Sequence, residues 1–175
     1  SILRNGPNSF KGRKLGLLLT DGSDAALFKA VTTAIDGVGA IWEVIAPKIG
    51  GVTLSDGQMV AARHKIDGGA SVLFDAVALL PSAEGAELLA RDATAKDFVS
   101  DGFAHCKFIG HSEAAGGLFA EARIPPELDA GFFPLDVKGD VAGFVDALGQ
   151  LRFWDREMEV DLDAVPPPTK KPAKR

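Results

Sequence analysis

Five consecutive residues, Gly110-His111-Ser112-Glu113-Ala114, have the spacing of a nucleophile elbow. In an elbow, a sharp turn between a strand and a helix presents a nucleophile, with small residues two positions before and after it. Gly110 and Ala114 meet that steric demand around Ser112. A serine hydroxyl also needs a general base, usually histidine. No histidine follows Ser112, which excludes the order Ser, acid, His of α/β-hydrolases. We therefore expect the backbone of an elbow without its catalyst.

The other candidate nucleophile is Cys106, the single cysteine of the chain. It precedes the expected elbow by six residues and so lies at the opposite end of the same strand. We favour a buried structural thiol over a catalytic one. A single cysteine cannot form an internal disulfide, which fits a reducing, cytoplasmic environment.

Binding of phosphate or metal finds little support in the sequence. The turn Asp21-Gly22-Ser23-Asp24 follows a strand and precedes a helix, where backbone N–H groups can bind phosphate. Its two acids would repel that phosphate, so we expect a helix cap, and a flavodoxin-type receiver of small molecules is disfavoured. The histidines, at His64, His105 and His111, lack the spacing of metal ligands.

Composition excludes several classes of function. The chain has 175 residues and no tyrosine, so tyrosine cannot serve here as acid, nucleophile or haem ligand. All 24 acids lie within residues 15–165, together with 11 bases, which gives that body a net charge of −13. We expect no nucleic-acid partner, because phosphate binding needs a basic surface. No apolar run approaches the ~20 residues of a membrane span, so we expect no membrane partner either.

The elements that position these residues alternate between strands and helices. Nearly unbroken apolar runs predict buried parallel strands, helical spacing predicts the helices, and Ser55-Asp56-Gly57 predicts a hairpin between 52–54 and 58–62. The expected strands are 14–20, 40–46, 75–80 and 106–111; the expected helices follow Asp24, cover 82–91, 94–103 and 113–122, and include Val141, Phe144, Val145, Leu148 and Leu151. This order predicts an α/β fold, a flavodoxin-like three-layer α/β/α sandwich with a mainly parallel sheet.

The ends of the chain differ from this body. Residues 1–13 read as a linker or arm, 14–155 as the domain, and 156–175 as an extension whose Pro/Lys-rich tail from Pro166 is expected to be disordered. Phe153-Trp154 is expected to plug the core, with an exposed partner patch as the alternative. Alternating acids predict a solvated face or strand edge; they are Asp155, Glu157, Glu159, Asp161 and Asp163.

Several stretches together resemble a known family. Segments 14–19 and 40–47 and the hairpin at 55–58 look like the PfpI-like domain of the class I glutamine amidotransferase-like superfamily. Residues 74–82 and 103–110 are similar to the C-terminal domain of large-subunit, monofunctional haem catalases. The resemblance covers roughly residues 10–155 and rests mainly on the order of elements and on the elbow.

The resemblance implies that the chain keeps the fold of PfpI-like proteins and has lost their chemistry. Active PfpI-like proteins have Cys then His at the elbow, with an acid from after the first strand nearby. The matching positions hold Ser112 and Glu113, with Asp21 or Asp24 after the first strand, so the chemistry is expected to be lost. The resemblance further implies that the parent protein is a homotetramer that decomposes hydrogen peroxide with haem. The haem would be bound by an upstream β-barrel domain, and residues 1–13 would be the connector that leads out of this barrel.

The expected function is therefore that of a non-catalytic domain. It would stabilise the parent catalase against its barrel and sister subunits, without a cofactor of its own, and could hold unfolded client proteins in a chaperone-like way. An edge strand at 58–62 would offer such clients a pairing site. The alternative is an active PfpI-like hydrolase, amidase or glyoxalase with Ser112 as nucleophile.

Overall fold

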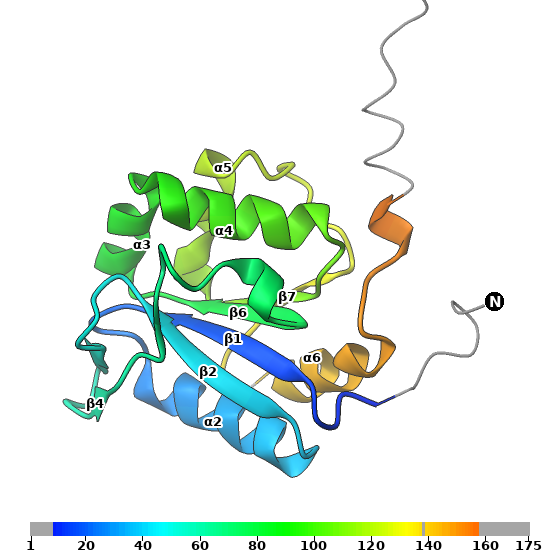
Figure 1. Cartoon of the computed structure of the whole chain (residues 1–175), viewed down its shortest axis with the longest axis horizontal. Helices are drawn as coiled ribbons and strands as arrows, with labels where there is room; N and C mark the ends of the chain where they lie inside the picture. Colours follow the sequence, from blue (N-terminus) through cyan, green and yellow to red (C-terminus); the bar gives the residue numbers. More distant parts are fainter. Residues whose placement is uncertain (1–8, 138, 158–175) are drawn as a thin grey trace, which may run out of the picture.

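A six-stranded sheet forms the centre of the computed structural model, which describes residues 9–137 and 139–157 (Figure 1). Its strand order is β5-β2-β1-β6-β7-β8, and all five strand pairs are parallel. The strands are β1 (Lys14–Leu19), β2 (Ile41–Ala46), β5 (His64–Lys65), β6 (Ala76–Leu80), β7 (Ile109–His111) and β8 (Phe132–Pro134). A separate hairpin pairs β3 (Val52–Thr53) with β4 (Met59–Val60).

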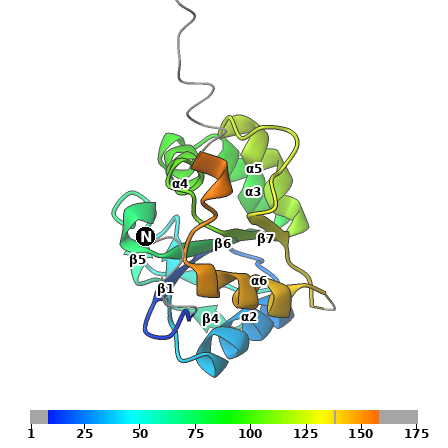
Figure 2. The ribbon, with the colours of Figure 1, turned by 90° about the vertical axis from the view of Figure 1, so that its right-hand side faces the viewer.

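Helices cover both faces of the sheet, as the sequence predicts (Figures 1 and 2). One face carries α2 (Ala25–Gly37) and α6 (Val141–Ala147), which continues into η3 (Leu148–Gln150). The opposite face carries η1 (Ser71–Leu73), α3 (Ala83–Ala90), α4 (Ala93–Ala104), η2 (Glu113–Ala115) and α5 (Gly116–Glu121). The α/β/α sandwich is confirmed.

The period of two along each strand divides the core into two layers. Leu15, Leu17 and Leu19 of β1 pack with α2 and α6, whereas Leu18 packs with α3 and α4 on the other face. Gly16 shares that second face, where a Cβ would lie 2.8 Å from the Phe74 ring. Strands buried on both faces explain why the sequence shows apolar runs rather than alternation.

The chain reverses its winding between β1 and β6. From β1 it moves outward to β2 and β5, then returns to β6 and continues to β7 and β8 on the other side. Doubly wound folds bind ligands at the carboxyl ends of the strands beside such a switch point. That edge also receives the residue that follows β7, Ser112.

Several expected elements need correction. The strand expected at 106–111 begins only at Ile109, because Cys106 has φ 58° and turns the chain. The hairpin is confirmed, and within 58–62 strand β4 is an edge strand of the separate two-stranded sheet, while the edges of the main sheet are β5 and β8. Phe10 and Arg156 are both buried, so the packed region is wider than 14–155.

Near the C-terminus, the structure agrees with some of the predictions and differs from others. Phe153 is half-buried with its ring centroid 6.0 Å from that of Phe108, whereas Trp154 is exposed. Asp155 and Glu157 are exposed and lie in a helical turn rather than at a strand edge. Glu159, Asp161, Asp163 and the tail from Pro166 lie outside the described residues.

Candidate functional site

Hydroxyl groups join the carboxyl ends of the two central strands, β1 and β6. Ser23 Oγ donates to the Leu80 carbonyl at 2.6 Å and accepts the backbone N–H of Thr20 at 3.0 Å. From β6, the Ser82 N–H donates to Thr20 Oγ1 at 2.9 Å, and Ser82 Oγ donates to the Asp21 carbonyl at 2.7 Å. We call Thr20, Ser23 and Ser82 the hydroxyl network. Hydrogen bonds between these neutral hydroxyls and the backbone thus tie the carboxyl ends of β1 and β6 together.

Ser112 lies beside this network in an ordinary backbone conformation. Its φ of −74° and ψ of 162° are extended, without the strain that a nucleophile elbow imposes on its central residue. The strand–turn–helix order expected at 110–114 is present, but the sharp elbow is not. The Ser112 hydroxyl donates to the Pro81 carbonyl at 3.3 Å. No hydrogen bond joins it to a histidine or carboxylate among the described residues.

His111 cannot serve Ser112 as a base from its position. Its side chain is buried, and its ring centroid lies 5.0 Å from that of Phe119 and 6.3 Å from that of Phe132. Burial lowers the pKa of His111, and its Nε2 has no hydrogen-bond partner among the described residues. A neutral ring in an aromatic pocket is the result. Glu113, the other ionisable residue of the stretch, is exposed.

The Asp21–Asp24 turn has a structural role. Asp24 caps α2 by accepting the Leu27 N–H at 2.8 Å, as the sequence predicts. Asp21 Oδ1 accepts the Thr53 N–H at 3.0 Å, and Lys48 Nζ donates to Oδ2 at 3.4 Å. The backbone hydrogen bond from Thr53, more than Lys48, lowers the pKa of Asp21. The turn therefore fixes the hairpin and the helix to the sheet.

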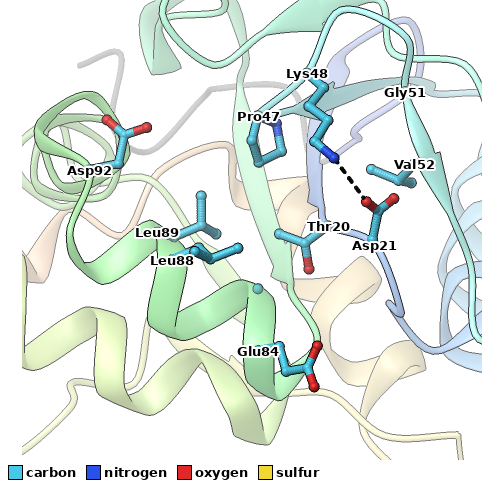
Figure 3. Close-up of a pocket in the computed structure, with 11 residues that line it drawn as sticks. Thr20, Asp21, Pro47, Lys48, Gly51, Val52, Glu84, Leu88, Leu89 and Asp92 are labelled. Atoms are coloured by element: carbon cyan, nitrogen blue, oxygen red, sulfur yellow. Dashed lines mark hydrogen bonds and ion pairs between the residues drawn. The ribbon is translucent and has the colours of Figure 1, made fainter.

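A cavity of about 260 Å³ opens next to the hydroxyl network (Figure 3). It lies between α3 and the loop after β2, at the carboxyl edge of the sheet. Figure 3 shows the Lys48–Asp21 ion pair on one side of the cavity and Leu88 and Leu89 of α3 facing it. Ser112 does not line it. Sequence reasoning missed this cavity, because its walls come from three distant segments.

Charged groups dominate the opposite, amino edge of the sheet. Arg156 is completely buried; its Nε and Nη2 donate to the two Asp129 carboxylate oxygens at 2.6 and 2.8 Å. Its Nη1 donates to the Lys107 carbonyl at 2.8 Å, and its guanidinium carbon lies 4.7 Å from the centroid of the Phe103 ring. Figure 2 views the molecule from this end and shows residues 152–157 passing between α4 and α6. We call these contacts of Arg156 the arginine anchor.

Cys106 belongs to this amino edge, not to the carboxyl edge with Ser112. It is 5% exposed, and burial raises its pKa, so the thiol stays protonated and a poor nucleophile. Its carbonyl accepts the Phe153 N–H at 2.7 Å. The next residue, Lys107, is also buried and donates from Nζ to the Ser71 carbonyl. Burial lowers the pKa of Lys107 to about 8.

The remaining histidines do not assemble a metal centre. His64 Nε2 lies 3.4 Å from Glu43 Oε2, while Lys14 lies 2.7 Å from Oε1 and Arg63 3.2 Å from Oε2. His105 Nδ1 lies 2.7 Å from the Asp101 carbonyl. Within residues 9–137 and 139–157, no three His, Cys, Asp or Glu side chains are grouped to hold a metal ion.

The same part of the chain contains no helix of the length and apolar character that crossing a bilayer requires.

The chain also has no tyrosine to ligate a haem iron. A tyrosine-ligated haem therefore has no iron ligand in this chain.

Comparison with solved structures shows the same fold. A two-domain protein from Anabaena variabilis, with DJ-1/ThiJ/PfpI-like and ferritin-like domains, matches with a TM-score of 0.58 and 14% identity, over 63% of this chain and 33% of that one. The VC2308 protein matches with a TM-score of 0.57 and 20% identity, over 65% and 59% of the two chains. These similarities support a PfpI-like, flavodoxin-like fold and nothing more specific.

Sequence comparison is more specific. Catalase C of Rhizobium meliloti (strain 1021) is 51% identical over 93% of this chain and 23% of that protein. Catalase HPII of Mycobacterium avium is 30% identical over 95% and 25%, and Catalase-1 of Neurospora crassa 28% over 86% and 24%. The chain thus spans about a quarter of the length of these relatives. Residues 11–158 match the family model for the C-terminal domain found in long catalases, and the chain belongs to that family.

Proposed function

We propose that this domain is a non-catalytic, stabilising part of a long catalase. The relatives named above are catalases, and the chain matches only about a quarter of their length. In this proposal the parent decomposes hydrogen peroxide with a haem held by an upstream barrel. The domain packs on that barrel and on sister subunits of a cytoplasmic homotetramer, and contributes no reacting group.

The observation that carries the proposal is that the hydroxyls of Ser112, Thr20 and Ser82 at the carboxyl edge are hydrogen-bonded within the protein. Where PfpI-like enzymes place a nucleophile, Ser112 bonds to a backbone carbonyl, and its neighbour His111 is buried against Phe119. The hydroxyls of Thr20 and Ser82 bond to each other and to backbone. Acyl or aldehyde chemistry needs an activated nucleophile within reach of a base. Hydrogen bonds within the protein already use the hydroxyls here.

The test compares the parent catalase with and without residues 14–157. We expect the shortened enzyme to keep its initial rate of peroxide decomposition per haem and to inactivate faster on heating. The 175-residue chain alone should show no peroxide decomposition. Unchanged heat resistance of the shortened enzyme would contradict the stabilising role, and activity of the isolated chain would contradict the non-catalytic one.

The alternative of an active hydrolase, amidase or glyoxalase has its own test. The chain is incubated with a peptide ester and with an α-oxoaldehyde, in parallel with the Ser112→Ala variant. We expect both proteins to give the rate of the buffer alone. Turnover that disappears in the Ser112→Ala variant would establish the alternative.

A chaperone-like role is a second candidate, which exposed apolar side chains favour. Ile49 is 80% exposed and Met59 76% exposed, on the loop and hairpin at the carboxyl edge of an acidic domain. Such side chains can contact unfolded proteins while the net charge keeps the complex in solution. Aggregation of a thermolabile client should fall in the presence of the chain and fall less with an Ile49→Ser, Met59→Ser variant. No protection at molar excess would rule this role out.

A further inference from the structure

We propose that the cavity between α3 and the loop after β2 binds a small organic cation, an apolar body carrying one ammonium group. This site is separate from the Ser112 region and independent of the stabilising role proposed above. The inference rests on the shape of the cavity, its apolar walls and the charges around it (Figure 3).

The walls of the cavity are built before any ligand arrives. Gly51 has φ +89°, and a Cβ there would lie 2.1 Å from the Val60 carbonyl oxygen, so the hairpin holds this loop closely. On the facing wall, a Cβ on Gly85 would lie 1.9 Å from Thr20 Oγ1, which shows how tightly α3 lies on the end of β1. A preformed cavity needs little ordering when it binds.

Apolar side chains form the body of the cavity. Pro47 and Val52 line the side of the loop, and Leu88 and Leu89 line the side of α3. Leu89 is 1% exposed, but Leu88 is 66% exposed, so a ligand in the cavity would cover apolar surface that now faces solvent. At about 260 Å³ the cavity is smaller than the ~300–1,000 Å³ of typical ligand sites, which restricts it to a small compound.

The charges select a cation. Three acidic residues, Asp21, Glu84 and Asp92, are among those that line the cavity, against the single basic residue Lys48. Asp21 already binds Thr53 and Lys48, and Asp92 binds Thr94. The exposed Glu84 side chain makes no hydrogen bond or ion pair with the described residues, so its carboxylate is available to a ligand. The net charge of −13 on residues 15–165 adds a long-range attraction for cations.

The position of the cavity agrees with how doubly wound folds bind ligands. It includes Thr20 and Asp21 at the end of β1, beside the reversal of winding between β1 and β6. Ligands of open parallel sheets bind outside the carboxyl ends of strands at such a reversal. The hydroxyl network closes the neighbouring position and leaves this cavity open.

The experiment titrates the ¹⁵N-labelled 175-residue chain with 2-phenylethylammonium and follows amide chemical shifts. We expect saturable shifts at Val52, Leu88 and Leu89. Neutral 2-phenylethanol should bind more weakly at the same amides, and anionic 3-phenylpropanoate weakest of all. Absence of saturable shifts, or tighter binding of the anion, would overturn the proposal. A flexible Leu-Lys peptide that moves the same amides at lower concentration would overturn the small-molecule assignment.

Variants locate the charge and the apolar wall. Glu84→Gln should weaken 2-phenylethylammonium binding about two- to fivefold, the range of an exposed ion pair, without affecting 2-phenylethanol. Glu87→Gln, exposed on the same helix outside the cavity lining, is the matched control and should change neither ligand. Leu88→Asn should weaken both. Equal binding of the cation by the Glu84→Gln variant would overturn the role of this carboxylate.

Discussion

The two edges of the sheet hold the molecule together with different chemistry. At the carboxyl edge, the neutral hydroxyls of Thr20, Ser23 and Ser82 bond to one another and to backbone groups. At the amino edge, the charged side chains of Arg156 and Lys107 are buried. The carboxyl edge also carries the exposed ion pair of Asp21 and Lys48, whereas the amino edge holds Arg156 and Lys107 in the interior.

Because of this difference, mutations and pH should affect stability differently at the two edges. Neutral hydrogen bonds contribute modestly one by one and do not titrate near neutral pH. Burying a charge costs free energy of folding unless the charge is paired, so removing its partner destabilises the folded state strongly. Because only the charged form carries this cost, stability also changes with the protonation of the group. We therefore expect large mutational effects and pH dependence from Arg156 and Lys107 at the amino edge, and smaller, pH-independent effects from the hydroxyl network at the carboxyl edge.

The largest effect is expected from removing the arginine anchor. Arg156→Ala removes the two hydrogen bonds that the guanidinium donates to the Asp129 carboxylate and leaves it with that of the Gly131 N–H, and breaking a buried pair in this way costs about 3–5 kcal/mol. Urea denaturation should show this loss of unfolding free energy. The unfolding free energy of Arg156→Lys should lie between those of the unchanged chain and of Arg156→Ala, because lysine cannot donate in a bidentate way. The exposed neighbour provides the control, since Asp155→Asn should change the midpoint very little. An unchanged midpoint for Arg156→Ala would contradict the anchor.

Lys107 should make stability depend on alkaline pH. Its pKa is about 8 in the folded chain against an ordinary 10.5, so between these values the unfolded chain binds the extra proton. Stability should thus rise with pH across this window, by about 3 kcal/mol in total. Cys106 acts in the opposite direction, because its raised pKa makes stability fall as pH rises above the ordinary thiol value of 9.0.

The contribution of Lys107 is isolated by comparing the chain with its Lys107→Met variant from pH 7 to 11. The difference in unfolding free energy between the two proteins should shrink toward high pH, while the contribution of Cys106 cancels. Parallel pH profiles would show that Lys107 carries no penalty and would weaken the contrast between the edges.

At the carboxyl edge, the close contact of Gly85 with Thr20 predicts a smaller effect. A methyl group on Gly85 would meet Thr20 Oγ1, so Gly85→Ala must shift α3 or the network, at a cost of about 1–3 kcal/mol. A methyl group on Gly117 of α5 would meet nothing within 4 Å, so Gly117→Ala should be neutral or stabilising. Thermal unfolding measures both, and equal midpoints for the two variants would refute the contact.

The smallest effect is expected for Ser82. Ser82→Ala removes the bond to the Asp21 carbonyl and the N-cap of α3, where Ser82 Oγ accepts the Gly85 N–H at 3.0 Å. Loss of a cap costs typically ~1 kcal/mol. The cost should be the same at pH 6 and pH 9, in contrast to Lys107. A marked difference between these pH values would break the proposed contrast between neutral and charged edges.

The sequence predicts the long buried elements well. Strand β1, helix α2 with its Asp24 cap, and strands β2 and β6 all lie within a residue or two of their expected ranges. Strands β5 and β8 escape prediction, because two or three residues show no periodicity. The strand expected at 106–111 is too long, since nothing in Cys106-Lys107 announces the positive φ of Cys106.

The chemistry of the site is only partly predictable. The absence of a base for Ser112 follows from the order of residues, but its unstrained backbone does not. The sequence pattern places Arg156 in an extension, because the acids around it suggest a solvated segment. Its role depends on Asp129, 27 residues away, and on the rings of Phe103 and Phe132 from other segments, a meeting that only the tertiary structure creates.

The arginine anchor also determines how the domain would respond to mechanical force. Residues 9–13 and 152–157 both lie at the amino edge, so a pull on the two ends of the described chain acts on one side of the molecule (Figure 2). The segment 152–157 belongs to no strand, whereas β1 has hydrogen-bonded neighbours on both sides. Tension would therefore peel this segment away first, and rupture of the Arg156–Asp129 pair would precede any shearing of the sheet.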